Sequence, residues 1–534
     1  MQSLRKTQLL LVAITAAALA PFLNKAFHID DPLFIWVAQQ IAKHPFDPYG
    51  FYVNWVSFRQ PMTIVMQNPP LCPYYIAAVA SVFGWTEPTL HLAFLFWATM
   101  SILGTFALAR RFCRKPLMAA MLTLFTPVFL VSATSTMCDV MMLAFWVWAL
   151  EFWFAGLDRQ ESWRFLVSAA LISADALTKY FGISLVPLLA VYTLARDRRL
   201  TAHLAFLLLP IAALFTYDLV TEGKYGYGLF SAAMSVSSSI SSATRPSHFV
   251  QMLMGLAFSG GCLVSALFFT PFSGRRLFLA AAISFGAFAA AFKFLICSWI
   301  YLETPEAAVW LEGGFFASIG VGILALAVIN MLQQKSADAL LLLLWIVGTF
   351  CFATFFNWSI TARTFLPMAP AVAILTIQHF ERLQKLSRLE YLPLLGAAGL
   401  SILIAVADYR QANCARDAAW LYQKRYGAEA SKVRFLGHWG FQYYMEQWGA
   451  KAFDRNNPKV AHGEIVVGPF SDPNVVHVSV EKVFTRDEST FRTLPFVSTF
   501  RLGTGAGFYS SFGGPLPWVI NKIPPERYYA VETR

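Results

Sequence analysis

Five charged side chains stand at the edges of long apolar segments, where charge is costly. Asp30 and Asp31 follow the first apolar segment, and Asp139 opens a later one. Lys179 and Arg363 stand at the edges of two more. Carboxylates near hydrocarbon are expensive unless they face water or a partner, so such residues are often functional. A carboxylate can act as a base, and Lys and Arg can hold an anion, so the set is typical of a site for a phosphorylated substrate.

Each of these residues also has a purely structural explanation. Asp30 and Asp31 can close a helix end with negative charge, and Asp139 can cap the helix that follows it, because anionic side chains favour helix amino termini. Lys179 and Arg363 can extend to lipid head groups. The functional interpretation therefore requires that the chain bring all five residues to one face of a membrane.

The composition indicates a polytopic α-helical membrane protein. Hydrophobic residues make up 57% of the 534 residues, and charged residues only 13%. Runs of about 17 to 25 apolar residues can cross a hydrocarbon layer about 30 Å thick. We expect a transmembrane module over residues 1–408, with a first outer loop at about 28–85. The module is predicted to hold about thirteen spans, near 8–27, 86–109, 117–134, 137–156, 163–178, 180–195, 202–220, 249–271, 277–297, 311–332, 338–356, 364–380 and 391–408.

Lys and Arg predict the orientation of the chain, because positive charge collects in short cytoplasmic loops. Clusters such as Arg110–Lys115 and Arg196–Arg199 fall in alternate connections, and the amino terminus carries Arg5 and Lys6. The amino terminus and these connections are therefore expected in the cytoplasm, with the protein in the cytoplasmic (inner) membrane. Residues Pro21–Leu23 extend the first apolar run beyond a typical signal core, so we expect an uncleaved anchor. The five charged residues at the segment edges then lie on the outer side.

After Asp408 the composition changes, because charged and turn residues return and no run could span a bilayer. Residues 409–534 are expected to form a small α/β domain on the extracytoplasmic, periplasmic side. Its predicted elements are a helix at 415–426 and short strands at 433–437, 464–468 and 476–480. The Gly-rich tract 503–514 lacks the strand and helix of a dinucleotide site and is predicted to be a loop.

The charge and the cysteines argue against two other kinds of site. The net charge of +11 largely reflects the cytoplasmic loops, and no basic patch is interleaved with exposed aromatic residues, so no nucleic-acid partner is expected. The seven cysteines are scattered without metal-ligand spacing. We expect them to be small apolar residues.

The order of these motifs resembles a known class of enzymes. The chain is similar to the GT-C class of polytopic membrane glycosyltransferases, close to its protein O-mannosyltransferase and lipid A aminoarabinose transferase branch. The resemblance rests on the following motifs: the acidic pair after the first span, Gln67-Asn68-Pro69-Pro70-Leu71 with Tyr74 and Tyr75, Asp139, Leu177-Thr178-Lys179, and the segment from Arg363 to Pro370. Two residues depart from the pattern: Asn68 stands where many members have His, and Asp31 where many have Glu.

The resemblance implies a hexosyl- or pentosyltransferase that uses a polyprenyl-phosphate sugar donor. Membrane lipids would surround it, and its acceptor would be a lipid, a glycan or a protein outside the cytoplasm. Asp30 is expected to be the base, with Asp31 as its neighbour or substitute and Asp139 as a third catalytic carboxylate. Lys179 and Arg363 are expected to bind the donor phosphate.

The resemblance also suggests a substrate loop and leaves the cofactor open. Asn68, Pro69 and Tyr74 are expected to belong to this loop. A leaving lipid monophosphate can be stabilised by Lys and Arg without a metal, and no DxD motif occurs in the outer loops. The alternative is a divalent cation such as Mg or Mn, which Asp30, Asp31 and Asp139 could share.

Two other functions share parts of this pattern. A lipid-linked sugar flippase or transporter would also carry ionisable residues in its membrane segments, although transporters usually place them at mid-membrane. An oligosaccharide polymerase or ligase would share the donor side of the chemistry. The donor distinguishes this last class from the transferase. The transferase would use a monosaccharide on one phosphate, and the polymerase or ligase an oligosaccharide on two.

Overall fold

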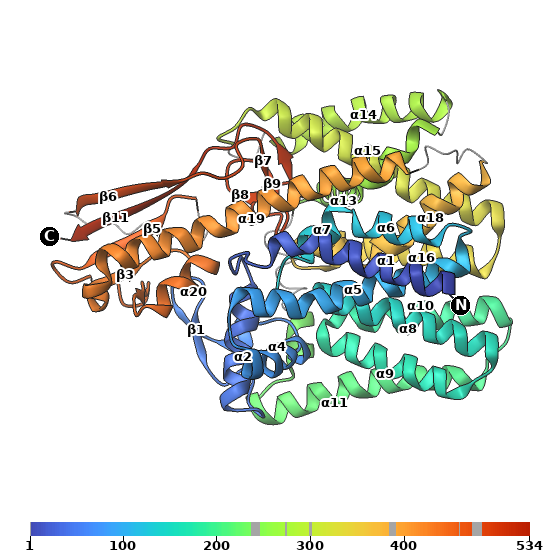
Figure 1. Cartoon of the computed structure of the whole chain (residues 1–534), viewed down its shortest axis with the longest axis horizontal. Coiled ribbons are helices and arrows are strands. Elements are labelled where there is room, and N and C mark those ends of the chain that lie inside the picture. Colours follow the sequence, from blue (N-terminus) through green and yellow to red (C-terminus); the bar gives the residue numbers. More distant parts are fainter. Residues whose placement is uncertain are drawn as a thin grey trace.

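The chain forms a bundle of helices with a β-rich region at one end (Figure 1). The computed structural model describes residues 2–235, 246–272, 275–297, 302–383, 391–458, 460–471 and 483–533. In Figure 1 the amino terminus lies at the end of the bundle opposite the β-rich region, and the carboxyl terminus lies at the far edge of that region.

The amino-terminal half of the bundle is built from antiparallel helices and a short segment between the first two long ones. Its helices are α1 (Gln2–Leu19), α2 (Asp31–Lys43), α3 (Met62–Val65), α4 (Leu71–Phe83), α5 (Glu87–Phe112), α6 (Pro116–Leu124), α7 (Pro127–Ser132), α8 (Asp139–Arg159), α9 (Ser162–Thr178), α10 (Leu185–Asp197) and α11 (Leu208–Tyr225). The hairpin of β1 (Tyr52–Asn54) and β2 (Arg59–Pro61) lies between α2 and α3. Helices α8 and α9 pack along each other, and α5 packs on α8.

The second half of the bundle continues this arrangement. Its helices are α13 (His248–Cys262), α14 (Arg275–Leu295), α15 (Glu306–Gln334), α16 (Ala337–Cys351), α17 (Ala362–Phe365), α18 (Met368–Arg382) and α19 (Leu392–Tyr426). Helix α15 packs against both α13 and α14, and α18 packs against α6 and α16. These contacts join the two halves into one bundle.

The predicted number of thirteen spans is not confirmed. Within the described residues, seven helical segments are long and apolar enough to cross a membrane: Leu4–Phe22, Glu87–Phe112, Asp139–Arg159, Ala202–Tyr225, Glu306–Gln334, Ala337–Phe356 and Leu392–Lys432. Other predicted spans are helical but shorter or broken. The span predicted at 117–134 is two short helices, because Pro127 begins α7 and the Thr126 hydroxyl caps it by accepting from the Phe129 amide. Pro367 similarly separates α17 from α18.

The basic loops meet at the end of the bundle opposite the β-rich region. Asp158 pairs with Arg111 at 2.7 Å and with Arg196 at 2.9 Å. Nearby, the Arg114 amide donates to the Glu381 carboxylate. The loops with the predicted cytoplasmic charge therefore gather at a single end. Three further basic residues of the predicted connections, Arg245, Lys385 and Arg388, lie outside the described residues.

Helix α19 carries the chain from the bundle into the β-rich region without a break (Figure 1). The helix predicted at 415–426 is therefore the last part of a 35-residue helix, and the expected boundary at 408/409 falls inside it. The change to polar residues ends the apolar run but does not end the helix. A helix continues as long as its backbone hydrogen bonds continue and residues such as Gly and Pro do not interrupt it.

The β-rich region contains a five-stranded sheet in the order β4-β3-β5-β11-β6. Its elements are β3 (Val433–Phe435), α20 (Trp439–Gln447), β4 (Lys451–Ala452), β5 (Ile465–Pro469), β6 (Val483–Phe491) and β11 (Glu526–Thr533). Short ladders join β7 (Val497–Ser498) to β10 (Val519–Ile520) and β8 (Phe500–Arg501) to β9 (Ala506–Gly507). The strands predicted at 433–437 and 464–468 are present, and the one predicted at 476–480 lies outside the described residues.

The Gly-rich tract is mainly loop, as predicted, and it packs against the bundle. Only β9 is regular within residues 503–514, and Gly503 and Gly505 have φ values of 77° and 86°. These lie in the left-handed region that glycine adopts without strain. The tract thereby turns back and brings Phe508 and Tyr509 against the bundle.

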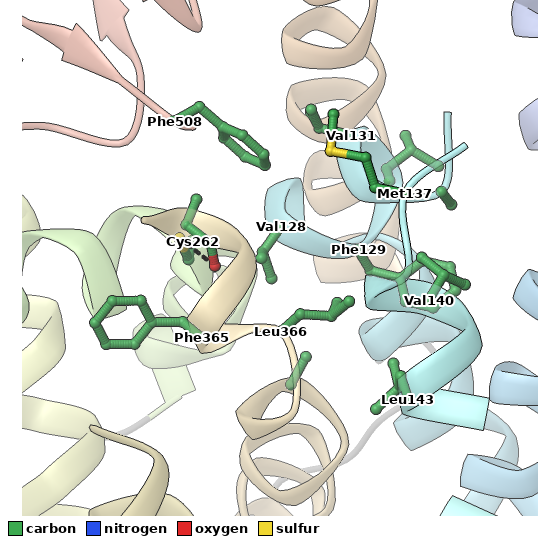
Figure 2. Close-up of a cluster of buried hydrophobic side chains, with 14 of the residues drawn as sticks. Val128, Phe129, Val131, Met137, Val140, Leu143, Cys262, Phe365, Leu366 and Phe508 are labelled. Carbon is green, nitrogen blue, oxygen red and sulfur yellow. Dashed lines mark hydrogen bonds between the residues drawn. The ribbon is translucent and has the colours of Figure 1, made fainter. Parts of the chain in front are cut away.

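A buried hydrophobic cluster fixes the segments that carry the charged residues (Figure 2). Met137 precedes Asp139, Phe365 and Leu366 follow Arg363, and Phe508 comes from the Gly-rich tract, and all four are buried. Such close-packed side chains resist displacement, because a shift of one element opens a cavity or a clash. The cluster therefore holds α7, α8, α17 and the Gly-rich tract at fixed relative positions.

Candidate functional site

Four of the five charged residues form one continuous chain of ion pairs. The Asp30 Oδ2 atom lies 2.6 Å from the Arg363 Nη2 atom. The Arg363 Nη1 atom lies 3.7 Å from Asp139 Oδ2, and Asp139 Oδ1 lies 2.5 Å from the Lys179 Nζ atom. Residues up to 333 positions apart in the sequence thus meet at one end of the bundle. The acidic and basic side chains alternate, so each charge has an opposite neighbour.

Each of these residues stands at the end of a helix or directly beside one. Asp30 is the residue before α2, Asp139 is the first residue of α8, and Lys179 follows the last residue of α9. Arg363 lies in the single-turn helix α17. Helix ends expose unpaired backbone groups and partial charge, which makes them suitable places for ionic sites.

The structural explanations account for only part of this arrangement. Asp139 lies in the first turn of α8, and its carboxylate also pairs with Lys179 and Arg363. The side chains of Lys179 and Arg363 are 20% and 13% exposed, so both point inward rather than toward head groups. The four charges are therefore organised around one another.

The four residues differ in access to solvent. Asp139 is 1% exposed, whereas Asp30 is 29% exposed and is the most accessible carboxylate of the set. The Nε atom of Arg363 is buried and has no hydrogen-bond partner among the described residues. An unpaired buried donor is costly, and a bound anion would satisfy it.

Asp31 is placed differently from its neighbour. It is fully buried, and it accepts hydrogen bonds from the His28 amide at 2.8 Å, the Thr136 amide at 2.8 Å and the Thr136 hydroxyl at 3.0 Å. Burial raises the pKa of Asp31 to about 6, although these donors and Lys25 act in the opposite direction. Asp31 thus ties the start of α2 to the turn before α8 and does not face the ion-pair chain.

The predicted substrate loop lies beside these residues. The Asn68 carbonyl accepts a hydrogen bond of 2.8 Å from the Tyr49 hydroxyl, and the Tyr74 hydroxyl donates to the Pro45 carbonyl at 2.5 Å. Pro69 and Pro70 lead into α4. Cys72 in α4 is buried, and burial, followed by the neighbouring Cys138, Asp139 and Asp31, raises its thiol pKa. The loop is thus anchored close to the carboxylates.

The three carboxylates do not converge as metal ligands. Asp30 and Asp139 are paired with cations, and Asp31 has three hydrogen-bond donors. Among the residues that the structure describes, no group of three or more His, Cys, Asp or Glu side chains could hold a metal ion. The observed arrangement therefore does not fit a divalent cation shared by Asp30, Asp31 and Asp139.

Sequence reasoning missed a second polar layer behind the ion-pair chain. The guanidinium carbon of Arg363 lies 5.4 Å from the centre of the Tyr509 ring. The Tyr509 hydroxyl donates to Asp408, which pairs with Lys25. Lys25 and Asp408 both stand at the ends of predicted apolar runs, which is the signal that could have marked them. Tyr509 carries no such signal, because it lies in a loop far along the chain.

Part of the chain matches a family of known glycosyltransferases. The sequence profile of the dolichyl-phosphate-mannose-protein mannosyltransferase family matches residues 67–220. This range includes Asn68, Asp139 and Lys179. The resemblance inferred from the sequence is thus confirmed over this part of the chain. No functionally curated protein sequence matches the chain.

Three solved structures are similar to this chain at low sequence identity. ArnT from Cupriavidus metallidurans, bound to undecaprenyl phosphate, is 14% identical with a TM-score of 0.44, over 86% of this chain and 93% of ArnT. The oligosaccharyltransferase of Archaeoglobus fulgidus is 13% identical with a TM-score of 0.47, over 84% of this chain and 64% of the archaeal protein. The mycobacterial arabinofuranosyltransferase AftD is 10% identical with a TM-score of 0.40, over 99% of this chain and 40% of AftD. This chain therefore spans less than two thirds of the length of the latter two.

Proposed function

We propose that the protein transfers a hexosyl or pentosyl group from a polyprenyl-phosphate donor to an acceptor on the extracytoplasmic side of the membrane. The observation that carries this proposal is the chain of ion pairs from Asp30 through Arg363 and Asp139 to Lys179. Two cations held about one buried carboxylate, next to one accessible carboxylate, suit an anionic leaving group and a base. The family match over residues 67–220 supports the same chemistry.

Arg363 and Lys179 are the proposed phosphate ligands. Arg363 has an unpaired buried Nε–H donor, and Lys179 has three donors, of which Asp139 accepts one. Arg363 can hold a phosphate through two parallel hydrogen bonds, and Lys179 acts as a point charge. Asp139, buried between them, keeps both cations in place and partly offsets their mutual repulsion.

Asp30 is the proposed base. It has the most exposed carboxylate of the ion-pair chain, so it alone of the three Asp residues can reach an acceptor hydroxyl from the solvent side. It would accept the proton of that hydroxyl while the acceptor oxygen bonds to the sugar C1 atom. The bond from C1 to the phosphate oxygen breaks, and the electron pair leaves on the lipid phosphate beside Arg363 and Lys179.

The sidedness is part of the proposal. The basic loops gather at the end of the bundle opposite the ion-pair chain, as the Asp158 pairs with Arg111 and Arg196 show. Positive charge favours the cytoplasmic side. The site, the segment at 28–85 and the β-rich region would then face the periplasm. The acceptor there would be a lipid, a glycan or a protein.

The test compares donor use by wild-type protein and two single variants. We use undecaprenyl phosphate as the binding probe and a labelled undecaprenyl-phosphate sugar as the substrate. Lys179→Ala and Arg363→Ala should each lower kcat/KM. The corresponding loss of transition-state stabilisation should be about 2 to 4 kcal/mol, the range expected for an oxyanion contact. Both should also weaken binding of the lipid phosphate. Arg59→Ala is the matched control, because Arg59 is an exposed arginine in the β1/β2 hairpin.

Two results would overturn the proposal. If both variants bind undecaprenyl phosphate as the wild type does, the phosphate assignment fails. If the wild-type protein moves the intact lipid-linked sugar between leaflets without cleaving it, the protein is a flippase and the transferase assignment fails.

A further inference from the structure

The Gly-rich tract of the β-rich region contributes the surface on which Arg363 rests. The Arg363 guanidinium carbon lies 5.4 Å from the Tyr509 ring centre, which is within the range of a cation–π contact. Arg363 is 13% exposed and Tyr509 3% exposed, so the contact is largely shielded from water. Such contacts are stronger when both groups are desolvated.

The backbone around Arg363 is also held by this tract. The Ala362 amide donates to the Phe508 carbonyl at 2.8 Å, and the Ser511 amide donates to the Ile360 carbonyl at 2.8 Å. In the Gly-rich tract, the bonded residues Phe508 and Ser511 lie before and after Tyr509. In the other segment, the bonded residues Ile360 and Ala362 come just before Arg363. The two segments therefore keep a fixed register, and the ring and the guanidinium are aligned by backbone as well as by side-chain contacts.

Tyr509 is in turn fixed by a buried ionic group. Its hydroxyl donates to Asp408 Oδ2 at 2.9 Å, and the Thr499 hydroxyl donates to Asp408 Oδ1 at 2.7 Å. The Lys25 ammonium lies 2.5 Å from the same carboxylate, and both charged side chains are fully buried. Burial, followed by the negative charge of Asp408, raises the pKa of Tyr509, so the phenol keeps the proton that it donates.

We propose that Tyr509 is a positioning residue that orients Arg363 for the donor phosphate. The ring contacts the guanidinium, and the buried Asp408 and Lys25 pair anchors the ring. The inference rests on the proposed function, because it assigns the support of the proposed phosphate ligand. It makes the β-rich region a necessary part of the donor site.

Ring and hydroxyl can be tested separately. Tyr509→Leu removes the ring and should weaken binding of undecaprenyl phosphate about tenfold, the order of one desolvated cation–π contact. Tyr509→Phe keeps the ring, so its affinity should stay within about threefold of wild type by the same reasoning. Its thermal stability should nevertheless fall, because Asp408 loses a buried hydrogen-bond donor.

The matched control is Phe470→Leu. The Arg527 guanidinium carbon lies 4.8 Å from the Phe470 ring centre, so this variant also removes an arginine–aromatic contact from the β-rich region. Phe470 follows β5 and is 53% exposed. Phe470→Leu should leave binding of undecaprenyl phosphate unchanged.

A double-mutant cycle separates positioning from a general loss of structure. If Tyr509 acts through Arg363, Tyr509→Leu should cause no further loss of undecaprenyl phosphate binding in an Arg363→Ala background. An equal tenfold loss in both backgrounds would overturn the inference, as would wild-type binding by Tyr509→Leu. Wild-type binding by Arg363→Ala would instead contradict the proposed function. A misfolded Tyr509→Leu protein leaves the Tyr509→Phe result decisive, because a loss there as large as that of Arg363→Ala contradicts support by the ring.

Discussion

Asp30→Asn should separate catalysis from both stability and donor binding. The variant keeps the size of the side chain and removes its negative charge. Asp30 is 29% exposed, and it forms a 2.6 Å ion pair with Arg363. Because such a partly exposed pair contributes about 1 kcal/mol or less, the melting temperature should change little. Turnover should fall by about 10² to 10⁴ if Asp30 is the general base.

Binding of the lipid phosphate should not fall with turnover in this variant. Replacing the carboxylate by a neutral amide weakens the contact that now holds the Arg363 Nη2 donor, so this donor competes less with the phosphate. The affinity for undecaprenyl phosphate should therefore stay equal or increase, so the loss appears in kcat rather than in KM.

The assay follows sugar transfer from a labelled donor by purified protein in lipid nanodiscs, with binding of undecaprenyl phosphate measured separately. Asp47→Asn is the matched control, since Asp47 is a similarly exposed carboxylate in the same segment, residues 28–85, and pairs with Lys224. Near-normal transfer by Asp30→Asn would refute the assignment of the base. A parallel fall in transfer and donor binding would refute the separation of roles.

Three further predictions concern charge, pH and topology. Asp139→Asn should lower the free energy of unfolding by about 3 to 5 kcal/mol, because it leaves two largely buried cations without their shared partner; thermal unfolding in detergent measures this. Burial raises the folded-state pKa of Asp31 from 3.8 to about 6, so its protonated form stabilises the fold below pH 3.8 and this contribution is lost as the pH rises to about 6. Asp31→Asn should therefore gain stability relative to wild type between pH 4 and pH 7, by up to about 3 kcal/mol, in melting curves at both pH values. A reporter that is active only outside the cytoplasm should be active when fused at Arg534 and inactive when fused at Leu383.

Each of these predictions has a distinct contrary outcome. An Asp139→Asn protein with wild-type stability would mean that the two cations do not depend on the shared carboxylate. A constant stability difference between Asp31→Asn and wild type across pH 4 to 7 would show that Asp31 has an ordinary pKa. Activity of the Leu383 fusion with silence at Arg534 would reverse the orientation.

The charged residues of the candidate site could be singled out from the sequence because their signal is local. Asp139, Lys179 and Arg363 each stand where an apolar run meets polar residues, and the predicted alternation of spans places them on a common membrane face. The different roles of Asp30 and Asp31 could not be predicted in this way. The burial of Asp31 depends on Thr136, which lies 105 residues away.

The breaks in the bundle were partly predictable and the second polar layer was not. Pro127 and Pro367 carry the usual signal for a helix boundary, which a count based on apolar length overlooks. The pairing of Lys25 with Asp408 joins residues 383 positions apart, and Tyr509 reaches them from a loop whose path depends on Gly503 and Gly505. Such contacts arise from tertiary packing, for which a single sequence holds no periodic signal.

The ion-pair chain is proposed to serve a reaction in which the bond between a sugar and a lipid phosphate is broken. The most direct measurement incubates purified wild-type protein with undecaprenyl-phosphate sugar labelled in the sugar, together with envelope lipids and glycans as acceptors. Free undecaprenyl phosphate and labelled acceptor should appear in equal amounts, and both should be lost in Asp30→Asn. Recovery of the intact donor, or its appearance unchanged in the opposite leaflet, would contradict the proposed transfer reaction.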